Sequence, residues 1–301
     1  MSTLPDLLLQ HARERPDAPA IREKRRGRWD ELSWSQYADR VKRVAHGLRE
    51  LGVQPGDRVA IHGENRPEWV IADLAIQGIG AVSVGVYPTS PAAEVEYLLA
   101  HSETVVLIAE DEEQLDKALA VRERLPDLRK IVLIDPRNVR ELGDVMTWEQ
   151  LEDHEPLEGF GEGLDPGETA VIVYTSGTTG PPKGAMLTHH NLTWAAGTFQ
   201  RAFGTGPDDE VLSYLPLCHV AERLGTVING LGTGYVVNFG EGGESFAQDL
   251  RDVQPTLFAA VPRVWEKMLA TVEIKMADAS PVKRWSYRTA TRLGSGRVGN
   301  A

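Results

Sequence analysis

Apolar and polar positions follow a helical period most clearly between residues 33 and 52. The apolar residues of this stretch recur at spacings of four and three, which places them on one face of a helix. They are Tyr37, Val41, Val44, Leu48 and Leu51. Ser33 followed by Gln36 matches a capping box, and Gly52 is a suitable terminator. The pattern therefore predicts an amphipathic helix.

A second pattern, short continuous runs rich in valine and isoleucine, recurs between the helical stretches. Runs of this kind are typical of strands that are covered on both faces. Strands are predicted over residues 57–63, 80–87, 104–110, 130–135, 169–175, 210–216, 234–240 and 256–261. Helices are predicted from near Pro67, over 92–102 and 112–125, from about His190, over 246–253 and from about Arg263.

This alternation of strands and helices predicts an α/β fold of mainly parallel sheets joined by crossover helices. Residues 137–168 have a weaker pattern and are rich in glycine, aspartate and glutamate. Such a stretch is typical of a connection between structural units. We therefore expect two sheet units, approximately residues 1–140 and 165–301.

Composition narrows the class of protein. The chain has 301 residues, 42% of them hydrophobic, and a net charge of -12, which argues against a nucleic-acid binder. Cys218 is the single cysteine, so a disulfide framework and a cysteine-based zinc cluster are excluded, and a reducing compartment fits. The amino terminus is a poor signal peptide, and no apolar stretch approaches the ~20 residues that span a bilayer. A cytoplasmic protein is expected.

A glycine-rich loop follows the predicted strand 169–175 and carries the strongest chemical signal. Gly177 and Gly180 permit backbone conformations closed to other residues and let main-chain N–H groups approach an anion. Lys183 adds a mobile positive charge. Hydroxyl donors come from Thr175, Ser176, Thr178 and Thr179. A flexible surface turn is the alternative, but this composition directly after a buried-type strand favours a polyphosphate site.

The stretch "YTSGTTGPPKGAMLTHHNL", residues 174–192, resembles the phosphate-binding signature of the adenylate-forming superfamily. This superfamily contains acyl-CoA synthetases, luciferases and peptide-synthetase adenylation domains. "ENRPEWVIADLAIQGIGAVSVGVYPTS" (64–90), "YLPLCHVAER" (214–223) and "VPRVWEKM" (261–268) resemble long-chain fatty acyl-CoA synthetases. The resemblance covers about residues 7–292 and implies an incomplete large amino-terminal domain of the adenylate-forming fold.

The resemblance also implies a reaction. ATP and a fatty acid would give an acyl-adenylate and pyrophosphate, and the thiol of CoA would then displace AMP. The implied phosphate-binding residues are Thr175, Ser176, Gly177, Thr178, Thr179, Gly180 and Lys183. Lys183 would also act catalytically by offsetting developing charge, and Thr175 would contact Mg²⁺. Fatty acid, ATP and CoA are thus the expected small-molecule substrates.

His219 follows a predicted strand, and the resemblance implies that it lies near the acyl and adenylate site as a second catalytic residue. A structural histidine is the alternative. The neighbouring Cys218 is interpreted as small core packing, because nothing near it in the sequence marks a catalytic dyad.

Three segments of the family have no match in this sequence. They are an aromatic-Gly-x-Thr-Glu segment, a Thr-Gly-Asp segment, and a small carboxy-terminal domain with a catalytic lysine. We therefore expect residues 1–301 to be a partial amino-terminal adenylation domain that cannot complete the reaction alone. Two alternatives remain: a non-catalytic phosphate- or nucleotide-binding remnant, and another adenylate-forming enzyme that acts on an aryl or amino acid. Acyl chain length and oligomeric state are not predicted.

Two basic clusters need interpretation. Residues 22–28 hold five basic residues in seven and predict a solvated hairpin turn. Residues 279–301 contain no acidic residue, and Arg284, Arg288 and Arg292 share one helical face beside Trp285. An exposed helix face is the first interpretation of this cluster, and peripheral contact with an anionic membrane surface is the alternative.

Overall fold

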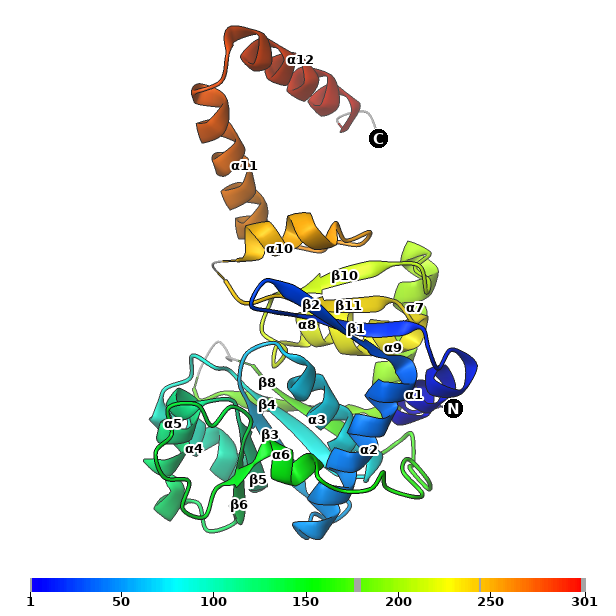
Figure 1. Cartoon of the computed structure of the whole chain (residues 1–301), viewed down its shortest axis with the longest axis vertical. Coiled ribbons are helices and arrows are strands. Elements are labelled where there is room, and N and C mark those ends of the chain that lie inside the picture. Colours follow the sequence, from blue (N-terminus) through cyan, green and yellow to red (C-terminus); the bar gives the residue numbers. More distant parts are fainter. Residues whose placement is uncertain (1, 176–179, 244, 299–301) are drawn as a thin grey trace. The chain divides into compact units, whose positions relative to one another are not determined.

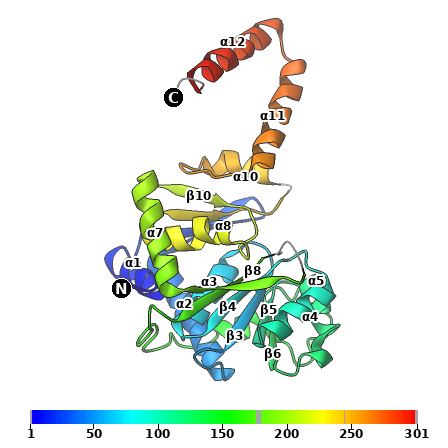
Figure 2. The ribbon, with the colours of Figure 1, turned by 180° about the vertical axis from the view of Figure 1, so that it is seen from behind.

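The computed structural model describes residues 2–175, 180–243 and 245–298. The chain divides into two compact units, residues 1–257 and 258–301. Figures 1 and 2 show the chain from opposite sides. The first unit contains two sheets and the helices that cover them, and it holds the hydrophobic core.

Seven strands of the described residues form the larger sheet. They are β3 (Arg58–His62), β4 (Val82–Val86), β5 (Thr104–Ala109), β6 (Lys130–Leu133), β7 (Met146–Thr147), β8 (Thr169–Thr175) and β9 (Lys183–Thr188). Their order across the sheet is β7-β6-β5-β3-β4-β8-β9. All neighbours are parallel except β9, which runs antiparallel to β8. The expected mainly parallel α/β fold is confirmed.

Helices cover both faces of this sheet (Figure 1). One face carries α2 (Trp34–Glu50), α3 (Pro67–Gly78) and α6 (Trp148–Glu152), and the other carries α4 (Ala92–His101) and α5 (Glu112–Leu119). Alternate strand residues supply the two cores: Ile61 joins the cluster with α2 and α3, and Ala60 joins the cluster with α4 and α5. The chain leaves β3 for β4 and then crosses back to β5. Because right-handed crossovers in opposite directions lie on opposite faces, α3 and α4 are separated by the sheet.

The helix predicted over residues 33–52 is confirmed as α2. Ser33 caps it, since the Ser33 hydroxyl accepts from the Gln36 backbone N–H and the Gln36 side chain accepts from the Ser33 N–H. Gly52, with a φ of 80°, follows the C-cap residue Leu51. The predicted apolar face is buried, with Val41, Val44 and Leu48 at 0% exposure.

The smaller sheet has the order β10-β11-β1-β2. Its strands are β1 (Pro19–Arg25), β2 (Arg28–Ser33), β10 (Glu210–Ser213) and β11 (Val236–Phe239). β1 and β2 form the hairpin predicted for residues 22–28, with Arg26 and Gly27 at positive φ in its turn. The hairpin is not wholly solvated, because Lys24 is only 8% exposed. Its Nζ bonds Asp249 at 2.9 Å and Asp252 at 2.6 Å, both on α10 (Phe246–Val253).

The division of the strands differs from the expected sheet units of about 1–140 and 165–301. β1 and β2 from the first range pair with β10 and β11 from the second, with Ile21 opposite Val237. β8 and β9 from the second range complete the sheet of β3 to β7. Strand pairing depends on which hydrogen-bonding edges meet in space, and nearness in sequence does not set it. The proposal of one partial adenylation domain over residues 1–301 is separate from this division and stays a prediction.

The first unit contains further helices and helical turns. They are α1 (Leu4–Glu14), the 3₁₀ turn η1 (Arg122–Arg124), α7 (His189–Phe203), α8 (Val220–Arg223), the π-helical turn η2 (Leu224–Ile228) and α9 (Asn229–Thr233). The helix expected over residues 112–125 is therefore divided into α5 and η1. The other helices predicted within this unit have counterparts in α3, α4, α7 and α10, and the helix predicted from about Arg263 has its counterpart in α11 (Pro262–Ala277) of the second unit.

The strand expected over residues 256–261 is wrong. The backbone N–H groups of Thr256 and Leu257 donate to the Glu210 carbonyl at 3.1 and 3.3 Å, so the stretch begins beside β10. Residues 258–261 belong to the other compact unit and have no strand assignment. An apolar run becomes a strand only where a neighbouring strand receives its backbone hydrogen bonds, and no strand is assigned over residues 256–261.

The second unit consists of α11 (Pro262–Ala277) and α12 (Pro281–Val298). No side chain of residues 258–293 in it is buried. Phe258 and Trp265 make an edge-on ring contact at 5.3 Å, and the Trp265 indole donates to the Ala260 carbonyl. No helix among the described residues has both the length and the apolar character needed to cross a bilayer.

Candidate functional site

The glycine-rich loop connects β8 to β9, so it is the end of an antiparallel hairpin. Thr175 pairs with Lys183 in the register of the two strands, and both side chains are exposed. The structure thus places two predicted site residues opposite each other on the two strands, at the loop end of one hairpin. The predicted residues Ser176, Gly177, Thr178 and Thr179 lie outside the described residues.

Gly180 has a φ of +84°, in the left-handed region where residues with side chains are strained. This agrees with the expectation that glycine is required in the loop for its backbone conformation. The carboxyl ends of β3, β4 and β8 lie at the same edge of the sheet as Thr175, because these strands are parallel. That edge, near a reversal of strand order, is where open α/β sheets bind ligands.

Side chains of α4 hold both ends of the loop. The Tyr174 hydroxyl lies 2.8 Å from the His101 Nδ1. The Tyr97 hydroxyl donates to the Pro182 carbonyl at 2.9 Å. Sequence reasoning missed Tyr97 and His101. Their spacing of four residues on a predicted helix shows that they share a face, but nothing in the sequence shows that this face meets the loop.

His219, the other predicted catalytic residue, lies at the N-terminus of α8. Its side chain is exposed, and its Nδ1 accepts a hydrogen bond from the Ala221 N–H at 3.1 Å. This contact caps a four-residue helix, which supports the structural alternative. Between the described residues, no hydrogen bond or ion pair joins His219 to β8 or β9. The structure therefore does not connect His219 directly with Thr175 and Lys183.

Two polar side chains anchor the segment that carries His219: Asn65, which is half-buried, and Glu222, which is buried. The Asn65 amide donates to the Ser213 hydroxyl at 2.8 Å and the Leu215 carbonyl at 2.6 Å, and it accepts from the Leu217 N–H at 3.0 Å. Glu222, 7% exposed, accepts four hydrogen bonds. Its donors are the hydroxyls of Ser213 and Thr226 and the N–H groups of Tyr214 and Leu215. Two stretches that the resemblance singled out, residues 64–90 and 214–223, thus contact each other.

Burial raises the pKa of the Glu222 carboxyl, while its hydroxyl and N–H donors oppose that shift. Asn65 and Glu222 were also missed by sequence reasoning. Asn65 stands between Glu64 and Arg66, and Glu222 is followed by Arg223, so neither differs in polarity from its neighbours in the sequence. The sequence gives no signal that tells these structural anchors from ligand-binding groups.

A buried charge pair lies behind the same segment. Arg223 is 1% exposed and Asp73, on α3, is 0% exposed, with the Arg223 Nη2 3.4 Å from the Asp73 carboxylate. The guanidinium also lies 4.8 Å from the centre of the Trp69 ring. A pair removed from water in this way holds its neighbourhood in one arrangement, because separating the two charges would leave each of them buried alone.

Cys218 is 3% exposed and backs onto β4, where a Cβ added to Gly85 would lie 2.8 Å from the Cys218 Cα. Burial raises the pKa of the Cys218 thiol to about 12. A thiol with such a pKa is almost wholly protonated at neutral pH and is a poor nucleophile. The interpretation of Cys218 as core packing is confirmed. Because β4 neighbours β8, this packing gives His219 an indirect structural link to the loop strand.

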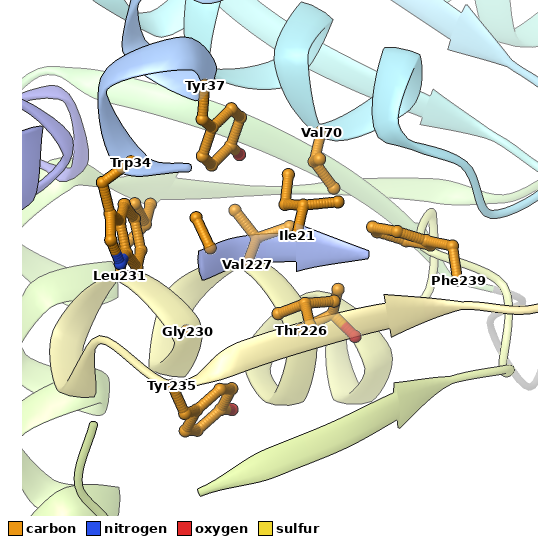
Figure 3. A pocket seen from close by; sticks show the side chains of 12 residues that line it. Ile21, Trp34, Tyr37, Val70, Thr226, Val227, Gly230, Leu231, Tyr235 and Phe239 are labelled. Atoms are coloured by element: carbon orange, nitrogen blue, oxygen red, sulfur yellow. The ribbon is translucent and has the colours of Figure 1, made fainter. Parts of the chain in front are cut away.

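An apolar cavity of about 20 Å³ lies beside the smaller sheet (Figure 3). Ile21 from β1, Tyr37 from α2 and Phe239 from β11 are among the side chains that border it. Its volume is close to the minimum that one water molecule needs. A space of this size is a local packing gap, and an acyl chain or a nucleotide would not fit in it.

Thr175 is the residue predicted to bind magnesium, and a magnesium site would need further oxygen ligands beside it. The described residues contain no group of three or more histidine, cysteine, aspartate or glutamate side chains that could hold a metal ion. Thr175 offers one exposed hydroxyl at the end of β8. Magnesium prefers octahedral oxygen ligands and commonly takes several of them from water and substrate phosphates. Thr175 is therefore compatible with such a site only as one ligand among others.

Comparisons with known proteins agree with the fold. A family model described as AMP-binding enzyme matches residues 8–297. The long-chain-fatty-acid–CoA ligase ACSBG2 of Rattus norvegicus is 32% identical over 306 residues, which cover 97% of this chain and 46% of the relative. The long-chain-fatty-acid–CoA ligase ACSBG1 of Homo sapiens is 32% identical over 281 residues, covering 89% of this chain and 39% of the relative. The chain thus spans less than half the length of these relatives.

Solved structures show the same fold. A putative long-chain-fatty-acid CoA ligase from Rhodopseudomonas palustris has a TM-score of 0.79 at 24% identity, covering 94% of this chain and 67% of its own. A long-chain-fatty-acid-CoA ligase from Archaeoglobus fulgidus has a TM-score of 0.76 at 25% identity, covering 90% and 54%. An anthranilate CoA ligase in complex with anthranoyl-AMP has a TM-score of 0.76 at 23% identity, covering 85% and 48%. This chain belongs to the AMP-binding enzyme family and has the α/β fold of the amino-terminal domains of adenylate-forming enzymes.

Proposed function

We propose that residues 175–183 bind the polyphosphate of ATP, and that the chain is the nucleotide-binding portion of an enzyme that converts a fatty acid through acyl-adenylate to acyl-CoA. The observation that carries this proposal is the hairpin end, where Thr175 and Lys183 lie opposite each other and exposed. The names of the curated relatives, which are long-chain-fatty-acid–CoA ligases, support the substrate class. ATP, fatty acid and CoA are accordingly the proposed substrates.

The chemistry assigned to the loop is charge stabilisation. Attack of a carboxylate on the α-phosphorus expels pyrophosphate, so negative charge grows on the leaving phosphate oxygens. A flexible ammonium at Lys183 and a hydroxyl at Thr175 are suited to bind such oxygens, with backbone N–H groups of a loop that contains Gly180. Mg²⁺, when bound, would neutralise part of the phosphate charge, and Thr175 would supply one of its ligands.

His219 is proposed to lie near the acyl and adenylate site. Its exposed imidazole on a firmly anchored segment is suited to contact a ligand, because the surrounding hydrogen bonds limit its movement. The capping contact with Ala221 uses Nδ1 and does not occupy Nε2. Its alternative role is the cap alone.

Two other functions remain candidates. The likeness to an anthranilate CoA ligase keeps open an enzyme of the same superfamily that acts on an aryl or amino acid. A non-catalytic phosphate- or nucleotide-binding module is the second, since the loop alone could hold phosphate. A cytoplasmic location is proposed for the chain whichever of the three functions holds, with contact between α12 and an anionic membrane surface as the alternative that its basic residues suggest.

The test is ligand discrimination by the 301-residue chain. Calorimetric titration with ATP, pyrophosphate and AMP, each with Mg²⁺, is expected to show binding of ATP and pyrophosphate. AMP lacks the two outer phosphates and should bind at least about tenfold more weakly, the scale of one lost charged contact. Equal affinity for AMP and ATP would contradict a polyphosphate role for the loop.

Pyrophosphate release tests the substrate class. Palmitate, anthranilate and amino acids are each added with ATP and Mg²⁺. Release with palmitate alone supports the fatty-acid enzyme, and release with an aryl or amino acid alone supports the other enzyme class. ATP binding without release for any acid is the result expected both of a portion that cannot complete the reaction alone and of a non-catalytic module.

A further inference from the structure

Tyr97 and His101 lie one turn apart on α4, and their rings stack at 5.3 Å with an interplanar angle of 27°. The helix itself is held firmly, because Val95, Leu98 and Leu99 are each no more than 1% exposed in the core on that face of the sheet. The stacked rings are therefore attached to a rigid support. Both of them reach the ends of the glycine-rich loop.

The first contact holds the end of β8. Tyr174 is 5% exposed, and its ring meets the His101 ring edge-on at 5.7 Å. Its hydroxyl lies 2.8 Å from the His101 Nδ1. Gly184, opposite Tyr174 on β9, makes room for this ring: a Cβ there would lie 3.3 Å from the Tyr174 Cζ and 2.8 Å from the Ile172 Cγ2. Glycine at 184 thus allows the phenol to lie across β9 toward α4.

The second contact holds the start of β9. The Tyr97 hydroxyl donates to the Pro182 carbonyl at 2.9 Å. Proline has no backbone N–H, so its carbonyl is the one backbone group by which this position can be tied down. Pro182, directly before β9, and Tyr174, the last buried residue of β8, are thereby both joined to α4. We name Tyr97, His101, Tyr174 and Pro182 the loop clamp.

We propose that Tyr97 and His101 are positioning residues, which hold the two ends of the glycine-rich loop at a set separation so that Thr175 and Lys183 are prearranged for a polyphosphate. The inference rests on the proposed function for its ligand. It follows from the placement of the contacts, because one is made to Tyr174, directly before Thr175, and the other to Pro182, directly before Lys183. A loop whose ends are already ordered loses less conformational entropy when it binds.

The affinity of the chain for ATP with Mg²⁺ tests whether these contacts contribute to ligand binding. Tyr97→Phe and Tyr174→Phe each remove one hydroxyl and keep the ring, and each is expected to weaken binding about three- to tenfold, the range of one hydrogen bond. Tyr287→Phe on α12 is the matched control and should bind as the unaltered chain does. Equal affinity for the unaltered chain and both hydroxyl-deletion variants would overturn the proposal.

Two further variants tell positioning from general damage. His101→Asn keeps a polar atom near the place of Nδ1 and is expected to restore most of the affinity that His101→Leu loses. His101→Leu combined with Tyr174→Phe should lose no more affinity than either change alone, because both break the same contact. Additive losses, or no rescue by asparagine, would overturn the assignment of this contact.

Amide hydrogen exchange tests the clamp without a ligand. In Tyr97→Phe and His101→Leu, exchange should speed up at the loop end of the hairpin, residues 173–175 and 183–185, and stay unchanged at its far end near Thr169 and Thr188. Unchanged exchange at the loop end would overturn the clamp. If the unaltered chain binds neither ATP nor pyrophosphate, the proposed function fails, and the exchange comparison still decides whether α4 orders the loop.

Discussion

The end of the β8–β9 hairpin and the segment from Ser213 to Arg223 both carry residues with candidate chemistry, yet they use their polar groups in opposite ways. At the hairpin end, the side chains of Thr175 and Lys183 are exposed, and the Lys183 ammonium makes no ion pair with another described residue. In the second segment, Glu222 accepts four hydrogen bonds. Asn65 makes three hydrogen bonds with other residues of this segment.

The difference separates binding groups from structural groups. A polar side chain whose hydrogen-bonding capacity is filled inside the protein contributes to the shape of the fold and has little left for a ligand. An exposed ammonium beside a strand end contributes little to stability and remains free to bind an anion. Substitutions should therefore reduce stability in the second segment and ligand binding in the hairpin.

The largest effect is expected for Glu222→Ala. The change leaves the hydroxyls of Ser213 and Thr226 and two backbone N–H groups without their acceptor in a buried place. The free energy of unfolding should fall by about 3 kcal/mol or more, a large part of the total of a typical domain. Urea unfolding followed by circular dichroism measures it. The exposed Glu158→Ala is the control, expected within about 0.5 kcal/mol of the unaltered chain; a similar small loss for Glu222→Ala would break the comparison.

The pH dependence of stability gives a second test of the buried polar groups, because His62 is one of them. His62, at the end of β3, is 0% exposed, and burial, aided by the positive charge of Lys117, lowers its pKa to about 4, while Glu113 opposes that shift. Between about pH 6.5 and 4 the unfolded chain binds the proton more readily. The stability due to neutral His62 is therefore full above pH 6.5 and is lost as the pH falls toward 4, by up to about 3 kcal/mol.

His62→Leu checks this assignment. The variant cannot take up the proton, so its free energy of unfolding should depend less on pH between 6.5 and 4 than that of the unaltered chain. Urea unfolding at several pH values in this range gives the two curves. Parallel curves would show that another group causes the acid sensitivity.

Lys183→Ala is expected to have the opposite profile to Glu222→Ala. The loss of an exposed ammonium should change the free energy of unfolding by no more than about 0.5 kcal/mol. Affinity for ATP with Mg²⁺ should fall about 10- to 100-fold, because a charge-assisted contact with phosphate is lost. Calorimetric titration measures the affinity, and Lys275→Ala on α11 is the matched control. Unaltered binding by Lys183→Ala would remove the lysine from the proposed site.

The smallest effect is expected for His219→Ala. Loss of the contact with the Ala221 N–H should cost about 0.5–1 kcal/mol of unfolding free energy, the range of a helix cap. His219→Asn retains a capping group and should restore the stability. If the imidazole also contacts the ligand, both variants should bind a non-hydrolysable acyl-adenylate analogue more weakly. Restoration of both properties by asparagine would leave His219 with its capping role alone.

The sequence by itself determined the local elements and the place of the loop. The helix of α2, its capping box and Gly52 follow from periodicity within some twenty residues, and the structure confirms them. The buried strands follow from runs of valine and isoleucine. Thr175, Gly180 and Lys183 stand out because a glycine- and hydroxyl-rich loop directly after such a run has few structural uses. All of these signals are complete within one short stretch of chain.

Only the tertiary structure decided which stretches meet. β1 pairs with β11 across more than two hundred residues, Lys24 is buried against α10, and residues 258–261 remain outside a strand. The contacts of Asn65 with Leu217 and of Tyr97 with Pro182 likewise join distant segments. The physical reason is that periodicity shows only which face of an element is apolar. The partner of that face, and the acceptor for each buried polar group, depend on packing among all the elements at once.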